Sequence, residues 1–140
     1  MGASLGRWAE KLAAWYLFAQ GLSCIDKNFH SRWGEIDLIM LDKTESCFGE
    51  NDQNTLHSSR TTPLTDAILV FVEVRYRSSE VYGSPAATVD RRKQAKILNT
   101  ARAFLAKHTE YNDLPVRFDV VAVTRRNYSP KILWIRDAFQ

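Results

Sequence analysis

Hydrophobic and polar residues alternate along two stretches of the chain, and alternation with a period of two is typical of β-strands. In residues 34–40, one face carries Ile36, Leu38 and Met40, and the other carries Glu35, Asp37 and Ile39. In residues 70–77, one face carries Val70, Val72, Val74 and Tyr76, and the other carries Phe71, Glu73, Arg75 and Arg77. Glu73 and Arg75 are therefore neighbours on one face, and Asp37 can lie near Glu73 if the two strands pair.

Apolar residues that recur every three or four positions predict two helices. The first begins at Ser4 as its N-cap and runs to about Gln20, where Gly21 ends it. We expect its core-facing stripe to consist of Leu5, Trp8, Leu12, Trp15, Tyr16 and Ala19. The second helix is capped by Asp90 and runs to about His108. Its apolar side consists of Ile97, Leu98, Ala101, Phe104 and Leu105.

Three further strands are predicted at residues 22–29, 116–123 and 132–135. The turn Arg32-Trp33-Gly34 joins the first of them to the Asp37 strand as an antiparallel hairpin. The order is then helix, three strands, helix, two strands, which predicts an α/β fold with a mixed sheet flanked by helices. The length of 140 residues fits one domain, residues 1–140.

Polar residues dominate between residues 42 and 66, and no periodicity is visible there. We expect an exposed loop insertion with little regular structure. Loops of this length are either functional or tolerated insertions. We favour a tolerated insertion, because the sequence shows no clustering of aromatic and basic residues in this segment.

The amino-acid composition says little about which molecules the protein binds. The net charge of +3 and the pI of about 9.0 are compatible with nucleic acid, although many proteins with other partners share them. Cys24 and Cys47 form neither a disulfide framework nor a zinc spacing, which indicates a reducing, cytoplasmic environment. No apolar run approaches transmembrane length, so we expect no membrane partner.

Asp37 and Glu73 on paired strands would supply hard oxygen ligands to Mg²⁺ or Mn²⁺. Such a metal makes a bound water a better nucleophile, and Arg75 beside it would stabilise charge on a phosphate. Glu10 has small or apolar helical neighbours and could add a third carboxylate. Two alternatives stay open: the strand residues can form a surface ion-pair ladder, and Glu10 can be a solvated surface glutamate.

Several segments together resemble one known family. They are Gly34-Glu35-Ile36-Asp37-Leu38-Ile39, Phe71-Val72-Glu73-Val74-Arg75-Tyr76-Arg77 and Arg117-Phe118-Asp119-Val120-Val121, with Gly6, Glu10, Ala13, Tyr16, Leu17, Gly21, Asn28, Val89, Lys93, Ala138 and Phe139. In these segments the chain resembles the bacterial YraN family over nearly its whole length, except residues 42–66. That family is assigned to the restriction-endonuclease-like, PD-(D/E)XK superfamily and is similar to archaeal Holliday-junction resolvases.

The resemblance implies an αβββαβ core of the restriction-endonuclease type. It also implies that Glu10 is the glutamate of the first helix, Asp37 the first strand carboxylate and Glu73 the glutamate of the E-x-K motif. Arg75 departs from the pattern, because the superfamily has lysine there and arginine does not deprotonate in proteins. Lys93 would take the role of this lysine if its side chain leans toward the sheet.

We therefore predict a metal-dependent endonuclease-like protein that hydrolyses phosphodiester bonds in nucleic acid, with DNA favoured over RNA. The alternative is a nucleic-acid-binding module of the same fold without turnover. The residues that we expect to contact the nucleic-acid backbone are Arg32, Arg77, Arg91, Arg92 and Lys93. A junction-cleaving enzyme would need two active sites and hence a homodimer.

Overall fold

The computed structural model describes residues 2–43, 66–77, 89–126 and 128–140. Its helices are α1 (Gly2–Ala19), α2 (Arg91–Lys107) and the short 3₁₀ helix η4 (Thr109–Tyr111). Its strands are β1 (Leu22–Ser31), β2 (Gly34–Asp42), β3 (Ile68–Arg77), β4 (Val116–Arg126) and β5 (Ser129–Ile135). Apart from η4, the order of elements in these residues is the predicted one.

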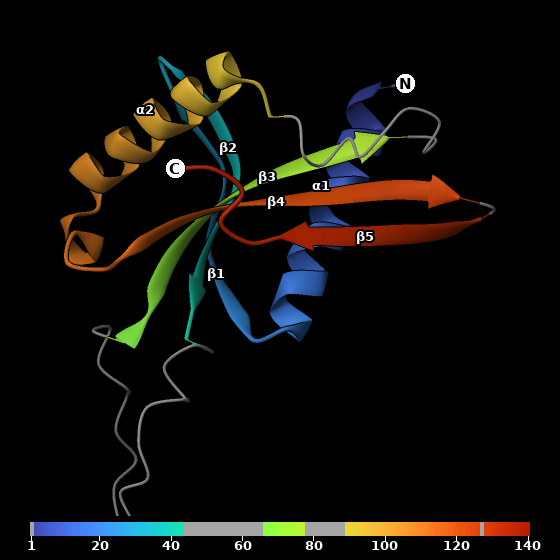
Figure 1. Cartoon of the computed structure of the whole chain (residues 1–140), viewed down its shortest axis with the longest axis horizontal. Helices are drawn as coiled ribbons and strands as arrows, with labels where there is room; N and C mark the ends of the chain where they lie inside the picture. Colours follow the sequence, from blue (N-terminus) through green and yellow to red (C-terminus); the bar gives the residue numbers. More distant parts are fainter. Residues whose placement is uncertain (1, 44–65, 78–88, 127) are drawn as a thin grey trace, which may run out of the picture.

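The strands form one mixed sheet in the order β1-β2-β3-β4-β5. β3 and β4 are parallel, and the other neighbouring strands are antiparallel. A parallel pair needs a crossover connection, and α2 lies in the connection between β3 and β4. The two helices pack on different buried clusters, one on each face of the sheet, and α1 passes behind the sheet in Figure 1. The predicted α/β fold with a mixed sheet flanked by helices is confirmed.

The face of α1 that packs on the sheet matches the predicted stripe only in part, because Leu12 and Tyr16 pack at the margin of the buried cluster but do not form its centre. Its buried residues are Ala9, Ala13, Ala14 and Leu17. Trp8 and Trp15 are 38% and 66% exposed, so the prediction that they lie in the core was wrong. Small side chains let the helix backbone approach the sheet closely, which leaves large rings at the margins of the contact.

The ends of the helices give one correction and one confirmation. α1 begins at Gly2, so Ser4 lies inside the helix and is not its N-cap. Asp90 caps α2 as predicted, because its Oδ1 accepts a hydrogen bond of 2.8 Å from the N–H of Lys93. In the described part of the chain, neither helix is long and apolar enough to cross a membrane.

A buried ion network lies at the end of β2, where the loop insertion was predicted to begin. Asp42 is the last residue of β2 and is 0% exposed, so the prediction was wrong at this residue. The guanidinium of Arg117 in β4 donates to Asp42 at 2.9 Å and to both carboxylate oxygens of Asp119 at 2.9 and 3.0 Å. The indole of Trp134 also donates to Asp119, at 2.9 Å. Residues 44–65, the remainder of the predicted insertion apart from Lys43 and Asp66, lie outside the described residues.

Candidate functional site

β2 and β3 separate at Asp37, and this separation creates the candidate site. Their register ends at the pair Leu38 and Val72. Beyond this pair, the backbone N–H of Val74 donates a hydrogen bond of 2.7 Å to Oδ2 of the Asp37 side chain. In a regular sheet this N–H would donate to a backbone carbonyl of the neighbouring strand. The Asp37 carboxyl group therefore lies between the two strands rather than on one face of a continuous sheet.

β2 also rotates at this residue. Leu38 and Met40 pack in the cluster on the α1 side, whereas Ile36 packs in the cluster on the α2 side. The prediction that these three residues share a face was therefore wrong at Ile36. Asn28, opposite Asp37 in β1, has a φ of 51°, a conformation that asparagine tolerates better than most residues. An asparagine at this position is the sequence signal for the irregularity.

Asp37 and Glu73 form a buried carboxyl pair, 7% and 8% exposed, whose side chains are in hydrogen-bonding contact. Burial raises the pKa of Asp37 to about 8, and the charge of Glu73 adds to the increase, while the hydrogen bond from Val74 opposes it. Burial also raises the pKa of Glu73, although the charge of Lys93 opposes the shift. The pair therefore retains a proton near neutral pH unless a further cation binds.

Two basic side chains approach this pair. Nζ of Lys93, in the first turn of α2, lies 3.4 Å from Oε1 of Glu73. Arg75 lies close enough for its charge to favour the ionised form of Glu73. In the described part of the chain, Nε of Arg75 is buried and has no hydrogen-bond partner. A buried donor without a partner is costly, and a bound anion such as phosphate would satisfy it.

Glu10 approaches from α1, and its charge further raises the pKa of Asp37. The hollow beside it, between α1 and the first two strands, has a volume of about 130 Å³. This hollow is lined by Arg7, Glu10, Lys11, Lys27, Asn28 and Leu38. Its three basic residues were missed among the predicted binding residues. Arg7 and Lys11 lie one helical turn apart around Glu10, and that spacing was a usable signal.

The five residues predicted to contact a nucleic-acid backbone do not form one cluster. Arg77, Arg91 and Arg92 are exposed at the end of β3 and the start of α2. The guanidinium of Arg32 stacks over Trp33 on the β1–β2 turn, 4.5 Å from the ring centre. Of these five, Lys93 is the one that the structure brings into contact with the carboxyl pair.

The sequence model of the family described as "Uncharacterised protein family UPF0102" matches residues 9–123. The chain belongs to this family. A UPF0102 protein of Alcanivorax borkumensis is 42% identical over 135 residues, which cover 96% of this chain and 90% of the relative. UPF0102 proteins of Saccharophagus degradans and Stutzerimonas stutzeri are 40% and 38% identical, and the matches cover 96% and 98% of this chain and 91% and 95% of the relatives. These matches confirm the YraN family that the sequence resembled.

The donor set of this UPF0102 protein fits a hard divalent cation. Asp37 and Glu73 present two carboxyl groups whose pKa values are raised mainly by burial, and for Asp37 also by the charge of Glu73. Among the described residues, no three His, Cys, Asp or Glu side chains converge to hold a metal ion, and Glu10 acts on Asp37 through its charge. Two carboxylates are enough for Mg²⁺, which commonly keeps several of its waters.

In metal-free buffer, Asp37→Asn is expected to raise the melting temperature by several degrees at pH 8.5 and to change it little at pH 4. The folded protein retains the Asp37 proton up to about pH 8. In the unfolded chain, Asp37 releases this proton at about pH 4. The free energy of unfolding therefore falls as the pH rises through this window. Asparagine removes this ionisation, while the facing charges of Glu73, Glu10 and Lys93 remain.

Thermal unfolding at the two pH values measures this effect, with the exposed Asp113→Asn as the control. An equal change at pH 4 and pH 8.5, or destabilisation at pH 8.5, would contradict the assignment of a raised pKa to Asp37.

Proposed function

We propose that this UPF0102 protein is a metal-dependent nuclease of the restriction-endonuclease-like, PD-(D/E)XK superfamily, and that it hydrolyses phosphodiester bonds in DNA. The observation that supports this most is the contact between the Asp37 and Glu73 carboxyl groups where β2 and β3 separate. Burying two adjacent carboxyl groups is costly, and a divalent cation offsets that cost. This arrangement is therefore better suited to a metal site than to an ordinary surface ion pair.

The residues have separate roles in this proposal. Asp37 and Glu73 would hold Mg²⁺ or Mn²⁺, which supplies Lewis acidity to the scissile phosphate when bound. Arg75 would donate its unpaired Nε–H to a phosphate oxygen. Lys93 reaches Glu73 from α2 and would place an ammonium group where the superfamily motif has its lysine. This ammonium group would stabilise the charge that develops on the phosphate.

One observation favours a second candidate, a nucleic-acid-binding module without turnover. Arg75 occupies the lysine position of the superfamily motif, and arginine does not act as a base. If Lys93 does not replace that lysine, the site would bind a phosphate without cleaving its ester. Cleavage of both strands of a branched junction would in addition need two copies of the chain.

The two candidate functions differ in whether the protein cleaves the nucleic acid that it binds. We expect the purified protein to cut labelled DNA when Mg²⁺ or Mn²⁺ is present and to stop when EDTA is added. Branched, single-stranded and duplex DNA, with matched RNA, would establish the substrate class. Lys93→Met is expected to lower the cleavage rate by about 100-fold, because it removes a donor that stabilises developing charge. The control is Lys96→Met, an exposed lysine on the same helix.

Binding of the same substrates must be followed alongside cleavage. Metal-dependent cleavage that is equally fast in Lys93→Met and Lys96→Met would remove Lys93 from the mechanism. Salt-sensitive binding without cleavage on any substrate would favour the binding module. The absence of both activities would overturn both candidates.

A further inference from the structure

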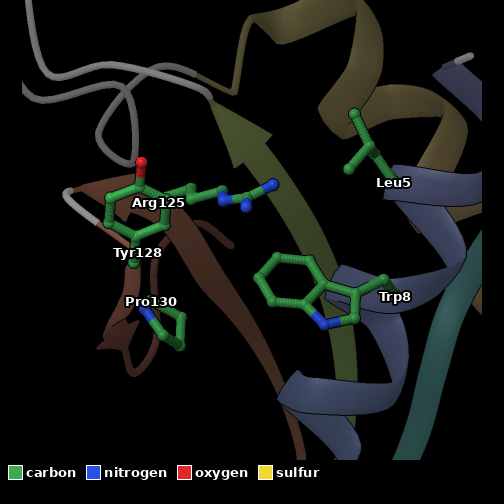
Figure 2. A pocket seen from close by; sticks show the side chains of 5 residues that line it. All are labelled: Leu5, Trp8, Arg125, Tyr128 and Pro130. Carbon is green, nitrogen blue, oxygen red and sulfur yellow. The ribbon is translucent and has the colours of Figure 1, made fainter.

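A second hollow lies on the other side of α1, against the β4–β5 hairpin. It has a volume of about 240 Å³ and is lined by Leu5, Trp8, Arg125, Tyr128 and Pro130. In Figure 2 the Arg125 side chain extends from the hairpin toward the indole of Trp8, and the Tyr128 ring lies beside the start of that side chain. All five residues lie outside residues 9–123, the part of the chain that the UPF0102 sequence model matches. None of the five is Asp37, Glu73 or one of the two basic residues beside them, so the hollow is a second candidate site.

Tyr128 occupies an unusual position in this hollow. It lies in the tight turn between Arg126 and Ser129, which pair across the hairpin, and it has a φ of 69°. Glycine or asparagine is the usual residue at such a position, because a tyrosine there holds a strained backbone conformation. Its ring is nevertheless 97% exposed, so it gains no stability from burial within the chain. An exposed aromatic ring held in such a conformation is more consistent with contact to a ligand than with a role in folding.

Two other residues that line the hollow, Trp8 and Arg125, add a second aromatic ring and a positive charge to the Tyr128 ring. Trp8 is 38% exposed, and its ring meets Tyr76 edge to face, with centroids 5.9 Å apart, which holds one side of the hollow in place. Arg125 is exposed, and within the described part of the chain no carboxylate forms an ion pair with it. The hollow therefore combines two partly or fully exposed aromatic rings with an exposed guanidinium that has no ion-pair partner among the described residues. That combination suits a flat aromatic group attached to an anion, and a nucleotide of a single strand has both parts.

The hollow is also connected to the carboxyl pair through β3 and β4. Arg77 pairs with Thr124, the residue before Arg125, and Tyr76 lies next to Arg75 on β3. The carboxyl ends of these parallel strands therefore carry Glu73 and Arg75 on β3 and Arg125 on β4. Glu73 and Arg75 share the face of β3 that carries Phe71 and packs toward α2, whereas Tyr76 and Trp8 lie on the α1 face. A nucleic-acid strand with a phosphate at Arg75 would therefore pass over the carboxyl ends of β3 and β4 to reach Trp8 and Tyr128.

We infer that the hollow binds an unpaired nucleobase of the substrate strand, with the base stacked against Tyr128 and Trp8 and a flanking phosphate near Arg125. This inference rests on the proposed function and extends it to a substrate class: nucleic acid with unpaired bases beside the scissile bond, rather than continuous duplex. Every base has an aromatic face, so such a site is tolerant of sequence.

The test is equilibrium binding in EDTA, where cleavage does not interfere. A labelled oligothymidylate and a blunt, fully paired DNA duplex of equal charge are compared by fluorescence anisotropy. Tyr128→Gly removes the ring and suits the positive φ, so it should not lower the melting temperature. We expect it to weaken binding of the single strand by at least about fivefold, and binding of the paired duplex by less than about twofold.

Three controls sharpen the test. Tyr128→Trp should restore single-strand binding, because it keeps a stacking surface. Phe18→Ala removes another exposed ring, 70% exposed, from the other end of α1 and should leave both affinities unchanged. Arg125→Ala should weaken single-strand binding, whereas the exposed Arg102→Ala should not.

The outcomes separate this inference from the proposed function. If wild-type protein does not prefer the single strand, or Tyr128→Gly weakens both ligands equally, the nucleobase site is overturned even where metal-dependent cleavage is observed. If the preference depends on Tyr128 but no substrate is cleaved with metal, the nuclease proposal fails and the nucleobase site stands. If wild-type protein binds neither ligand, the nucleobase site is overturned as well.

Discussion

Glu73→Gln is expected to lower metal-dependent cleavage of DNA by about 100- to 1000-fold while the fold survives. The substitution keeps the size of the side chain and removes one of the two carboxylates proposed to hold the metal. It also takes away the partner that Lys93 contacts at 3.4 Å. The buried pair would then hold less negative charge, so the melting temperature in metal-free buffer at neutral pH should be maintained or rise.

The matched control is Glu35→Gln, because Glu35 is an exposed carboxylate on β2 that contacts His30 instead of the buried pair. Initial cleavage rates at saturating Mn²⁺ should separate the two variants. A second readout does not need activity: Mn²⁺ should raise the melting temperature of the wild-type and Glu35→Gln proteins more than that of Glu73→Gln. Cleavage by Glu73→Gln at the wild-type rate would assign the activity to a contaminant or to another site, and this form of the nuclease proposal would be abandoned.

Arg117→Ala is expected to have the largest effect on stability, a loss of about 3–5 kcal/mol in the free energy of unfolding. Asp42 and Asp119 are both 0% exposed, and Arg117 donates to each of them. Burial alone would lower the pKa of the Arg117 guanidinium, but its contacts with Asp119 and Asp42 raise this pKa, so the cation is firmly held. Its removal would leave two buried carboxylates to share the indole and backbone donors near Asp119.

Urea unfolding measures this loss, and the exposed Arg102→Ala, expected to change the free energy by less than about 0.5 kcal/mol, is the control. A domain of ordinary stability has about 5–15 kcal/mol in total, so the alanine variant would lie close to the folding threshold. Arg117→Lys keeps the charge but not the planar fork and should be intermediate. A loss below about 1 kcal/mol in Arg117→Ala would show that the network contributes little to stability.

The sequence by itself determined the order of elements and much of the candidate site. Strand alternation depends only on local geometry, so the spacing of Phe71 and Glu73 was enough to place them on one face of β3. The cap at Asp90 is also local, because the side chain bonds to an N–H three residues later. The proximity of Asp37 and Glu73 followed from the pairing of two recognisable strands. Family membership likewise follows from the sequence alone.

Tertiary structure decided the features that depend on contacts distant in the sequence. The spacing of apolar residues predicted that one side of α1 is apolar. In the structure the face with Ala13 and Leu17, and not the one with the tryptophans, packs on the sheet, because backbones that pack closely require small side chains. The rotation of β2 at Asp37 arose where its carboxyl group replaced a backbone partner of Val74. Asp42 became a buried residue because Arg117, 75 positions later in the chain, lies against it. Spacing rules describe neighbours along the chain, and each of these outcomes was set by a partner that only folding brings near.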